Sequence, residues 1–297
     1  MGYEWCALAS ATLWAVAALI SVKPARHLGA FAYSRWRMLM VTLMLACGSL
    51  FTGGWQSLPG TAWSALALSG LVGIFIGDTA LFACMNRLGP RRSGLLFSCH
   101  ALFSALLGLW LFGEALTGAR LWGAALVLCG VWLAIAFGRR AQAHEWEAVQ
   151  GTLLLGVGLG LLAALCQSAG AVIAKPVMQD AAVDPVTASG VRMATALAAH
   201  VLLRLTRLPL TLPLRPLNRE ILALISLNGF LAMTLGMTLI LAALRLGDVG
   251  MVSILSSTTP VILLPLLWWH TGQRPALPAW LGAACATAGT MLVLGAA

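Results

Sequence analysis

The chain has 297 residues, of which 60% are hydrophobic and 9% are charged, whereas roughly 25% of the residues in an ordinary soluble domain are charged. Lys and Arg number 18 against 9 Asp and Glu, which gives a formal net charge of +9. This composition excludes a soluble globular domain and indicates a polytopic, all-α integral membrane protein.

Ten apolar segments follow one another along the chain. A hydrocarbon core about 30 Å thick needs about 20 residues of helix, and the alternating pattern of a β-barrel is absent. The charged segment 139–150 separates two halves, which we assign to residues 1–138 and 151–297. We expect transmembrane helices over residues 4–22, 30–50, 63–86, 92–112, 119–138, 151–173, 186–204, 221–243, 249–270 and 278–296.

Prolines are expected to end several of these helices, because the ring removes a hydrogen-bond donor and clashes with the preceding turn. Pro260 and Pro265 instead fall inside the ninth segment, where we expect a kink. The prolines expected at helix ends are Pro24, Pro59, Pro90, Pro176, Pro185 and Pro275.

Basic residues lie mainly between the apolar segments, where they can contact lipid headgroups, so nucleic acid is not an expected partner. The seven cysteines are scattered singly without a metal-ligand or redox spacing. We therefore expect no metal and no cofactor.

The two halves repeat the same motifs in the same order, which predicts an internal duplication. Because each copy has five segments, the second copy must enter the membrane in the opposite orientation, a plan that recurs in secondary transporters. The matching pairs are Lys23-Pro24 with Lys175-Pro176, Ser34-x-x-Arg37 with Ser189-x-x-Arg192, Arg87-Leu88-Gly89 with Arg245-Leu246-Gly247, and Gly113-Glu114 with Gly272-Gln273.

These motifs carry a resemblance to the EamA-type families of the drug/metabolite transporter superfamily. The resemblance implies ten helices around a central cavity and, in many members, export of amino acids or other metabolites. It rests on Gly77-Asp78-Thr79, Arg87-Leu88-Gly89, Leu111-Phe112-Gly113-Glu114, Trp122-Gly123 and Gly130, and in the second copy on Arg245-Leu246-Gly247, Ser256 to Pro260, Gly272-Gln273 and Trp280-Leu281-Gly282.

This chain departs from the family pattern at two places. Gln273 stands where the family usually carries Glu, and His100-Ala101 replaces a helix-breaking proline in the first half. The basic connections favour both termini outside the cell, whereas the resemblance implies both inside. We expect the inside orientation, because arginines close to segment ends are easily assigned to the wrong connection.

Asp78 is the strongest candidate for a functional side chain. No charged residue occurs from Met38 to Gly77, and Asp78 then follows near the middle of a span, where a carboxylate is costly. His100 lies at a similar depth on the next helix, so the two side chains could exchange a proton or contact substrate. The alternative is structural hydrogen bonding by each residue. The second copy has Gly236 and Thr259 at the matching positions, so this pair occurs once.

Arg37 and Arg192 are related by the repeat and form a second candidate pair. Two guanidinium groups could bind a carboxylate or phosphate on a substrate. The bland interpretation, which we favour from sequence, is that they reach the interface or bond to backbone carbonyls of a neighbouring helix.

Other polar residues receive mainly structural roles. Glu114 and Gln273 are expected to cap the following helix, and Lys23 and Lys175 to anchor helices at the interface. The hydroxyl run before Pro260 could bond the loosened backbone or a substrate. Candidate wall residues of the cavity are Trp14, Gln167, Asn228, Thr258 and Thr259.

We therefore expect a multi-pass permease of the cell membrane, with the inner or plasma membrane as its location. It would move a small organic metabolite, with protons as the candidate coupling ion, and would act as a monomer or homodimer in the bilayer. No ATP-binding motif is present, so we expect secondary transport. Alternatives are a carrier of a nucleotide-sugar or lipid-linked head group, a membrane-embedded enzyme, or a structural membrane subunit.

Overall fold

The structure is a computed structural model that describes residues 2–136, 152–180, 182–271 and 276–295. Within these residues it is all-helical, without a β-strand. The first half comprises α1 (Tyr3–Leu28), α2 (Ala30–Thr52), α3 (Ala62–Gly70), a π-helix (Leu71–Ile76), α4 (Gly77–Ser98), α5 (His100–Phe112) and α6 (Gly118–Ala136). The second comprises α7 (Leu153–Met178), α8 (Pro185–Leu205), α9 (Arg219–Gly229), a π-helix (Phe230–Met237), α10 (Thr238–Ala243), α11 (Val249–Ser256), α12 (Thr259–Thr271) and α13 (Leu277–Gly295).

In the described part of the chain, consecutive elements join into ten helical segments close to the positions expected from sequence. Seven of the described segments are long and apolar enough to cross a bilayer. Two shorter apolar helices, Gly118–Leu133 and Leu277–Val293, accompany them. α2 has 23 residues but also contains Arg35 and Arg37, which lower its mean hydropathy. The protein is thus a multi-pass integral membrane protein.

Large apolar side chains cover the outer surface. Phe51 is 91% exposed, Trp269 is 87% exposed and Trp110 is 80% exposed. Such a surface would be an aggregation liability in water, but it suits contact with lipid chains.

The expected helix ends at Pro24 and Pro176 are wrong. α1 continues through Pro24 to Leu28, and α7 continues through Pro176 to Met178. A change from apolar to charged sequence indicates where a segment leaves the hydrocarbon, and a helix can continue beyond that boundary. Pro90 also lies within α4, although that helix turns sharply at Gly89, where φ is 82°. Pro185 begins α8 as expected, and Pro275 lies outside the described residues.

The third segment of each half contains a π-helix, at Leu71–Ile76 and Phe230–Met237. Such segments are rare and often occur at functional sites. The fourth segment of each half also tightens at matching positions. Cys99 N–H donates to Leu96 C=O at 3.2 Å, and Thr258 N–H donates to Leu255 C=O at 3.3 Å, each three residues back. The loss of proline at His100-Ala101 therefore does not remove the break from the first half.

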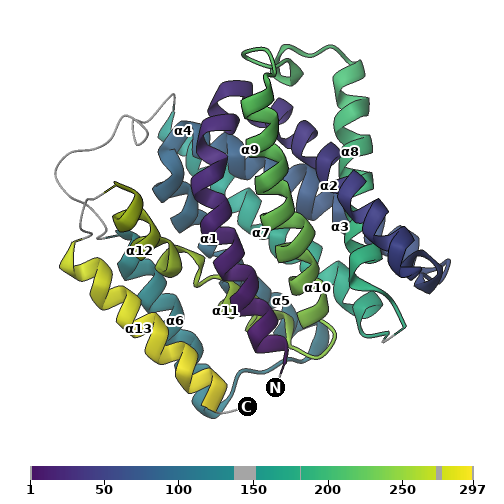
Figure 1. The fold of residues 1–297 in the computed structure, drawn as a ribbon. Coiled ribbons are helices and arrows are strands. Elements are labelled where there is room, and N and C mark those ends of the chain that lie inside the picture. The colour runs from purple at the N-terminus through teal and green to yellow at the C-terminus, as the bar shows by residue number, and fades with distance from the viewer. Residues whose placement is uncertain (1, 137–151, 181, 272–275, 296–297) are drawn as a thin grey trace.

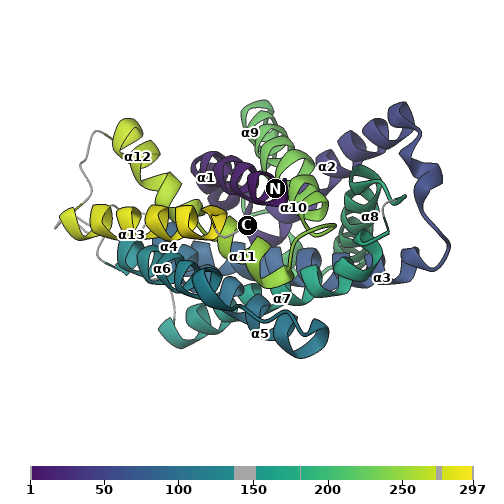
Figure 2. The ribbon, with the colours of Figure 1, turned by 90° about the horizontal axis from the view of Figure 1, so that it is seen from below.

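The two fifth helices, α6 and α13, pack along one edge of the molecule (Figure 1, Figure 2). A Cβ on Gly130 would lie 2.5 Å from Gly282 C=O, and one on Gly289 would lie 2.6 Å from Gly123 C=O. Higher numbers on one helix oppose lower numbers on the other, so α6 and α13 are antiparallel. Glycine is required because the two backbones meet directly.

The two ends of the described chain lie on the same side of the helical bundle (Figure 1, Figure 2). A chain that crosses a membrane an even number of times has both of its ends on the same side, so this placement agrees with the ten expected crossings.

Candidate functional site

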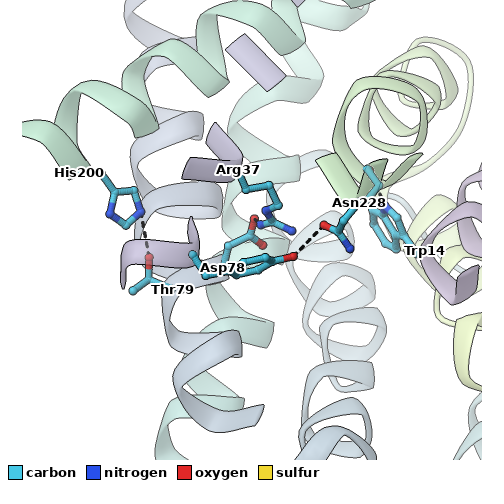
Figure 3. Close-up of polar contacts among 8 residues, drawn as sticks. Trp14, Arg37, Asp78, Thr79, His200 and Asn228 are labelled. Carbon is cyan, nitrogen blue, oxygen red and sulfur yellow. Dashed lines mark hydrogen bonds and ion pairs between the residues drawn. The ribbon is translucent and has the colours of Figure 1, made fainter. Parts of the chain in front are cut away.

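Arg37 and Asp78 form a buried ion pair. Arg37 Nη2 donates to Asp78 Oδ2 at 2.5 Å, and the two side chains are 3% and 8% exposed. α2 supplies the arginine, and α4 supplies the aspartate immediately after the first π-helix. The two side chains point toward one another between a His200–Thr79 contact on one side and Asn228 and Trp14 on the other (Figure 3). Arg37 therefore does not reach the interface.

Aromatic rings hold the Arg37 side chain. Its guanidinium carbon lies 4.6 Å from the centre of the Phe82 ring and 5.5 Å from that of Tyr33. Tyr33 Oη donates to Asn228 Oδ1 at 2.9 Å, and Asn228 Nδ2 donates to Ala17 C=O at 2.7 Å. Asn228 belongs to the second half of the chain, and Tyr33 contacts Arg37. The Asn228 amide therefore links the Arg37–Asp78 pair of the first half to the second half.

Arg192 is also buried, at 2% exposed, which is contrary to an interfacial anchor. Its Nη2 lies beside the close crossing of Gly73 and Gly170. Within the described residues the Nε of Arg192 is a buried donor without a hydrogen-bond partner. Gly73 belongs to the π-helix that directly precedes α4 and Asp78, so the Arg192 guanidinium lies in the same cluster as the Arg37–Asp78 pair.

Reciprocal contacts relate the surroundings of the two arginines. A Cβ on Gly70 would lie 2.7 Å from Arg192 Cα, and one on Gly229 would lie 3.5 Å from Arg37 Cγ. Gly70 and Gly229 occupy matching positions in the two third segments. Each arginine thus lies against a glycine of the opposite half.

A second reciprocal contact fixes the register of the repeat at Asp78. A Cβ on Gly77 would lie 3.1 Å from Cys166 Cβ, and one on Gly236 would lie 2.8 Å from Trp14 Nε1. Gly236 therefore matches Gly77, and Met237 matches Asp78. The sequence comparison, which placed Gly236 opposite Asp78, was wrong by one residue. The second half still has no carboxylate at this position.

His200 belongs to this cluster and was missed from sequence. Its Nε2 lies 3.2 Å from Thr79 Oγ1, and its ring meets the Phe75 ring edge-on with centres 4.7 Å apart. The imidazole is 2% exposed. The sequence could have identified His200 by the same criterion as His100, because both are ionisable residues inside an apolar segment.

His100 and Asp78 have different contact partners. Its carbonyl accepts from Ser168 Oγ at 2.8 Å, and its ring is centred 5.0 Å from that of Phe97. In the described part of the chain its Nδ1 has no hydrogen-bond partner. Among the described residues no hydrogen bond joins His100 to Asp78, whose partner is Arg37.

The candidate wall residues make mainly backbone contacts. Trp14 Nε1 donates to Ala232 C=O of the second π-helix at 2.8 Å. Thr258 and Thr259 donate to carbonyls three residues back, at 2.7 and 2.8 Å. Gln167 is buried on α7 at 8% exposed. The hydroxyl run before Pro260 therefore bonds the loosened backbone, one of the two expected roles.

Glu114 caps a different helix from the one expected. It does not cap the following helix, α6: its Oε2 accepts from Val249 N–H at 2.7 Å, at the start of α11. Its Oε1 pairs with Lys175, whose side chain is only 6% exposed, so Lys175 is not an interfacial anchor. Lys23 is 59% exposed and pairs with Glu220. Gln273 lies outside the described residues.

Among the residues that the structure describes, no three His, Cys, Asp or Glu side chains gather in a group that could hold a metal ion.

Comparison with known proteins gives the same architecture. Residues 1–136 and 154–295 each match the model of the EamA-like transporter family. A solved structure, described only as the crystal structure of a protein, shares 20% identity with this chain and superposes with a TM-score of 0.76. That alignment covers 99% of this chain and 97% of the solved one, so the fold is shared. The search of curated proteins found no match.

Proposed function

Because the chain belongs to the EamA-like transporter family, a family of transporters and not of enzymes, we propose that it exports a small organic metabolite. The substrate class that we propose is an amino acid or a related amphipathic compound. The transport is secondary, works by alternating access, and is driven by a proton gradient or by the gradient of the substrate itself.

We further propose that residues 1–138 and 151–297 are two inverted five-helix repeats that enclose a central substrate cavity. Three observations support this arrangement. α6 and α13 are antiparallel, the glycine contacts at Arg37 and Arg192 are reciprocal, and both third segments contain a π-helix. Two similar halves that pack in opposite directions can exchange conformations, which is the basis of alternating access.

The buried Arg37–Asp78 pair is the observation on which we base a coupling between proton movement and substrate movement. Asp78 lies where the two halves meet, because α4 packs against α7 and the π-helix before it contacts Gly170. In the ionised state the pair ties α2 to α4. Protonation of Asp78 would remove the attraction and free α4 to move relative to α2. We propose that this step couples proton movement to substrate movement.

Reconstituted proteoliposomes test this proposal. Flux of a labelled metabolite panel is measured with and without an imposed pH gradient, for the wild-type protein and for Asp78→Asn. We expect the wild-type protein to carry at least one compound, and the variant to lose the flux that depends on the pH gradient while remaining folded.

Asp180→Asn is the matched control, because Asp180 is exposed and its carboxylate accepts a hydrogen bond from the nearby Ala182 N–H rather than from another helix. Wild-type flux from Asp78→Asn would remove Asp78 from the mechanism. No flux for any compound of a broad panel would contradict the transport function itself.

A further inference from the structure

We propose that Arg192 binds an anionic group of the substrate, and that the transported compound is an organic monoanion bearing a carboxylate. This inference rests on the proposed transport of a small organic metabolite. Within the proposed amphipathic compounds, it favours carboxylates without an ammonium group over zwitterionic amino acids. The internal repeat relates Arg192 to Arg37, but Arg192 has no carboxylate that pairs with it as Asp78 pairs with Arg37.

The charge balance of the cluster is the first argument. Two buried guanidinium groups lie in this cluster: Arg37 pairs with Asp78, and the Arg192 Nη2 lies beside Gly73, on the π-helix that leads to Asp78. Whichever arginine Asp78 pairs with, one positive charge remains. An uncompensated charge in a low-dielectric interior is costly, so a visiting anion would be strongly stabilised there.

No other carboxylate of the described chain is available to Arg192. Glu114 pairs with Lys175, Glu220 pairs with Lys23, and Asp184 caps α8 through Thr187 N–H. The other described acidic residues, Glu4, Asp180 and Asp248, lie at or beside the ends of helices.

The broken symmetry of the repeat is the second argument. Asp78 pairs with Arg37 in the first half, and Met237 occupies the matching position in the second half. Thr238 Oγ1 lies 3.1 Å from Ser189 Oγ, which places the start of α10 beside α8 about one turn before Arg192. Met237 is buried and apolar, so the second half supplies no carboxylate to Arg192, and a ligand could supply one.

The chemistry favours a carboxylate with a single negative charge. A planar guanidinium donates two parallel hydrogen bonds to a carboxylate. One negative charge balances the one positive charge that the cluster leaves over, whereas a zwitterion brings an ammonium group that would need its own partner. Arg192 is 2% exposed, so the anion reaches it when the surrounding helices separate.

Matched ligands on purified full-length protein test this inference. Thermal stability is recorded against increasing benzoate, hexanoate, benzamide, hexanamide, phenylalanine or chloride, at constant ionic strength. We expect at least one of the two carboxylates to raise the unfolding temperature, and the amides, phenylalanine and chloride to have no such effect. In Arg192→Met the half-saturating carboxylate concentration should rise at least about tenfold.

Two further variants separate binding from folding. Arg192→Met should be at least as stable as wild type without ligand, because the uncompensated charge is gone. Met237→Asp should supply the missing carboxylate from within the chain, and so reduce the response to carboxylates while Arg192 is kept. A purely structural arginine would instead give a less stable Arg192→Met.

The outcomes distinguish this inference from the transport function. Flux of a neutral or cationic metabolite, with no response to either carboxylate, would overturn the role of Arg192 and leave transport intact. A response to chloride equal to that to carboxylates, or an unchanged response in Arg192→Met, would also overturn it. No flux for any compound would contradict transport instead.

Discussion

At the scale of single residues, the ionisable groups of the cluster occupy the membrane interior in very different states. Asp78 and Arg37 neutralise each other, and rings of Tyr33 and Phe82 cover the guanidinium. The Nε of Arg192, in contrast, is a buried donor without a hydrogen-bond partner in the described part of the chain. A buried ion pair contributes little net stability, but removal of one partner leaves an uncompensated buried charge.

Removal of the Asp78 carboxylate should therefore be severe. Asp78→Ala is expected to lower the free energy of unfolding by about 3–5 kcal/mol, because Arg37 would remain buried and unpaired. Asp78→Asn should cost less, since its amide oxygen still accepts a hydrogen bond. The measurement is reversible unfolding in mixed micelles.

A second ion pair provides the control for this prediction. Glu220→Ala breaks the exposed Lys23–Glu220 pair and should change the free energy of unfolding by less than about 1 kcal/mol. The double variant Arg37→Met with Asp78→Leu should recover most of the loss. Equal effects of Asp78→Ala and Glu220→Ala would show that the Arg37–Asp78 pair is not buried.

At the scale of elements, glycine decides which helices approach most closely. Gly130 and Gly289 bring α6 and α13 into backbone contact, and Gly73 and Gly170 do the same for the first π-helix and α7. Lipid chains are as apolar as the helix surfaces, so close packing between small residues supplies much of the attraction between helices in a bilayer.

A methyl group at the α6–α13 contact should disrupt it. In Gly130→Ala the new Cβ would lie 2.4 Å from Ala286 N, so the backbones must separate. We expect a loss of about 1–3 kcal/mol, as for other overpacked sites. The free energy of unfolding is again the measurement.

Gly158→Ala is the control variant on α7. Gly158 is exposed, and a Cβ there would meet nothing within 4 Å. Alanine favours helix over glycine by about 0.5–1 kcal/mol, so this variant should be neutral or slightly stabilised. A Gly130→Ala protein as stable as Gly158→Ala would mean that α6 and α13 are farther apart than in Figure 1.

At the scale of the whole molecule, ten helical segments bring both ends of the described chain to one side (Figure 1). The conflict over orientation remains. Arg37 and Arg192 are buried inside α2 and α8, so neither belongs to a connection whose basic residues set the orientation. Arg37 counts toward one side of the membrane and Arg192 toward the other, so setting both aside keeps the bias, and both termini inside the cell stays a prediction.

Reporter fusions at the two termini test the topology. A reporter that is active only in the cytoplasm, placed after residue 297 or before residue 1, should be active in both fusions. Reporters on opposite sides would contradict an even number of crossings. Two inactive reporters would keep the ten segments and reverse the orientation.

Sequence alone determined the class, the number of segments and most of their ends, because lipid requires each crossing helix to be long and apolar. It also identified Asp78, Arg37 and Arg192, since charge inside an apolar segment stands out. It could not detect the π-helices, which follow from local backbone packing and leave no residue pattern here.

Only the tertiary structure decided which charges meet. Sequence suggested that Asp78 faces His100, because adjacent helices place them at one depth, but helix rotation is set by packing against other segments. That packing turned Asp78 toward Arg37, Thr79 toward His200 and Glu114 toward α11. Depth follows from position along a single helix, whereas facing depends on how all the helices fit together.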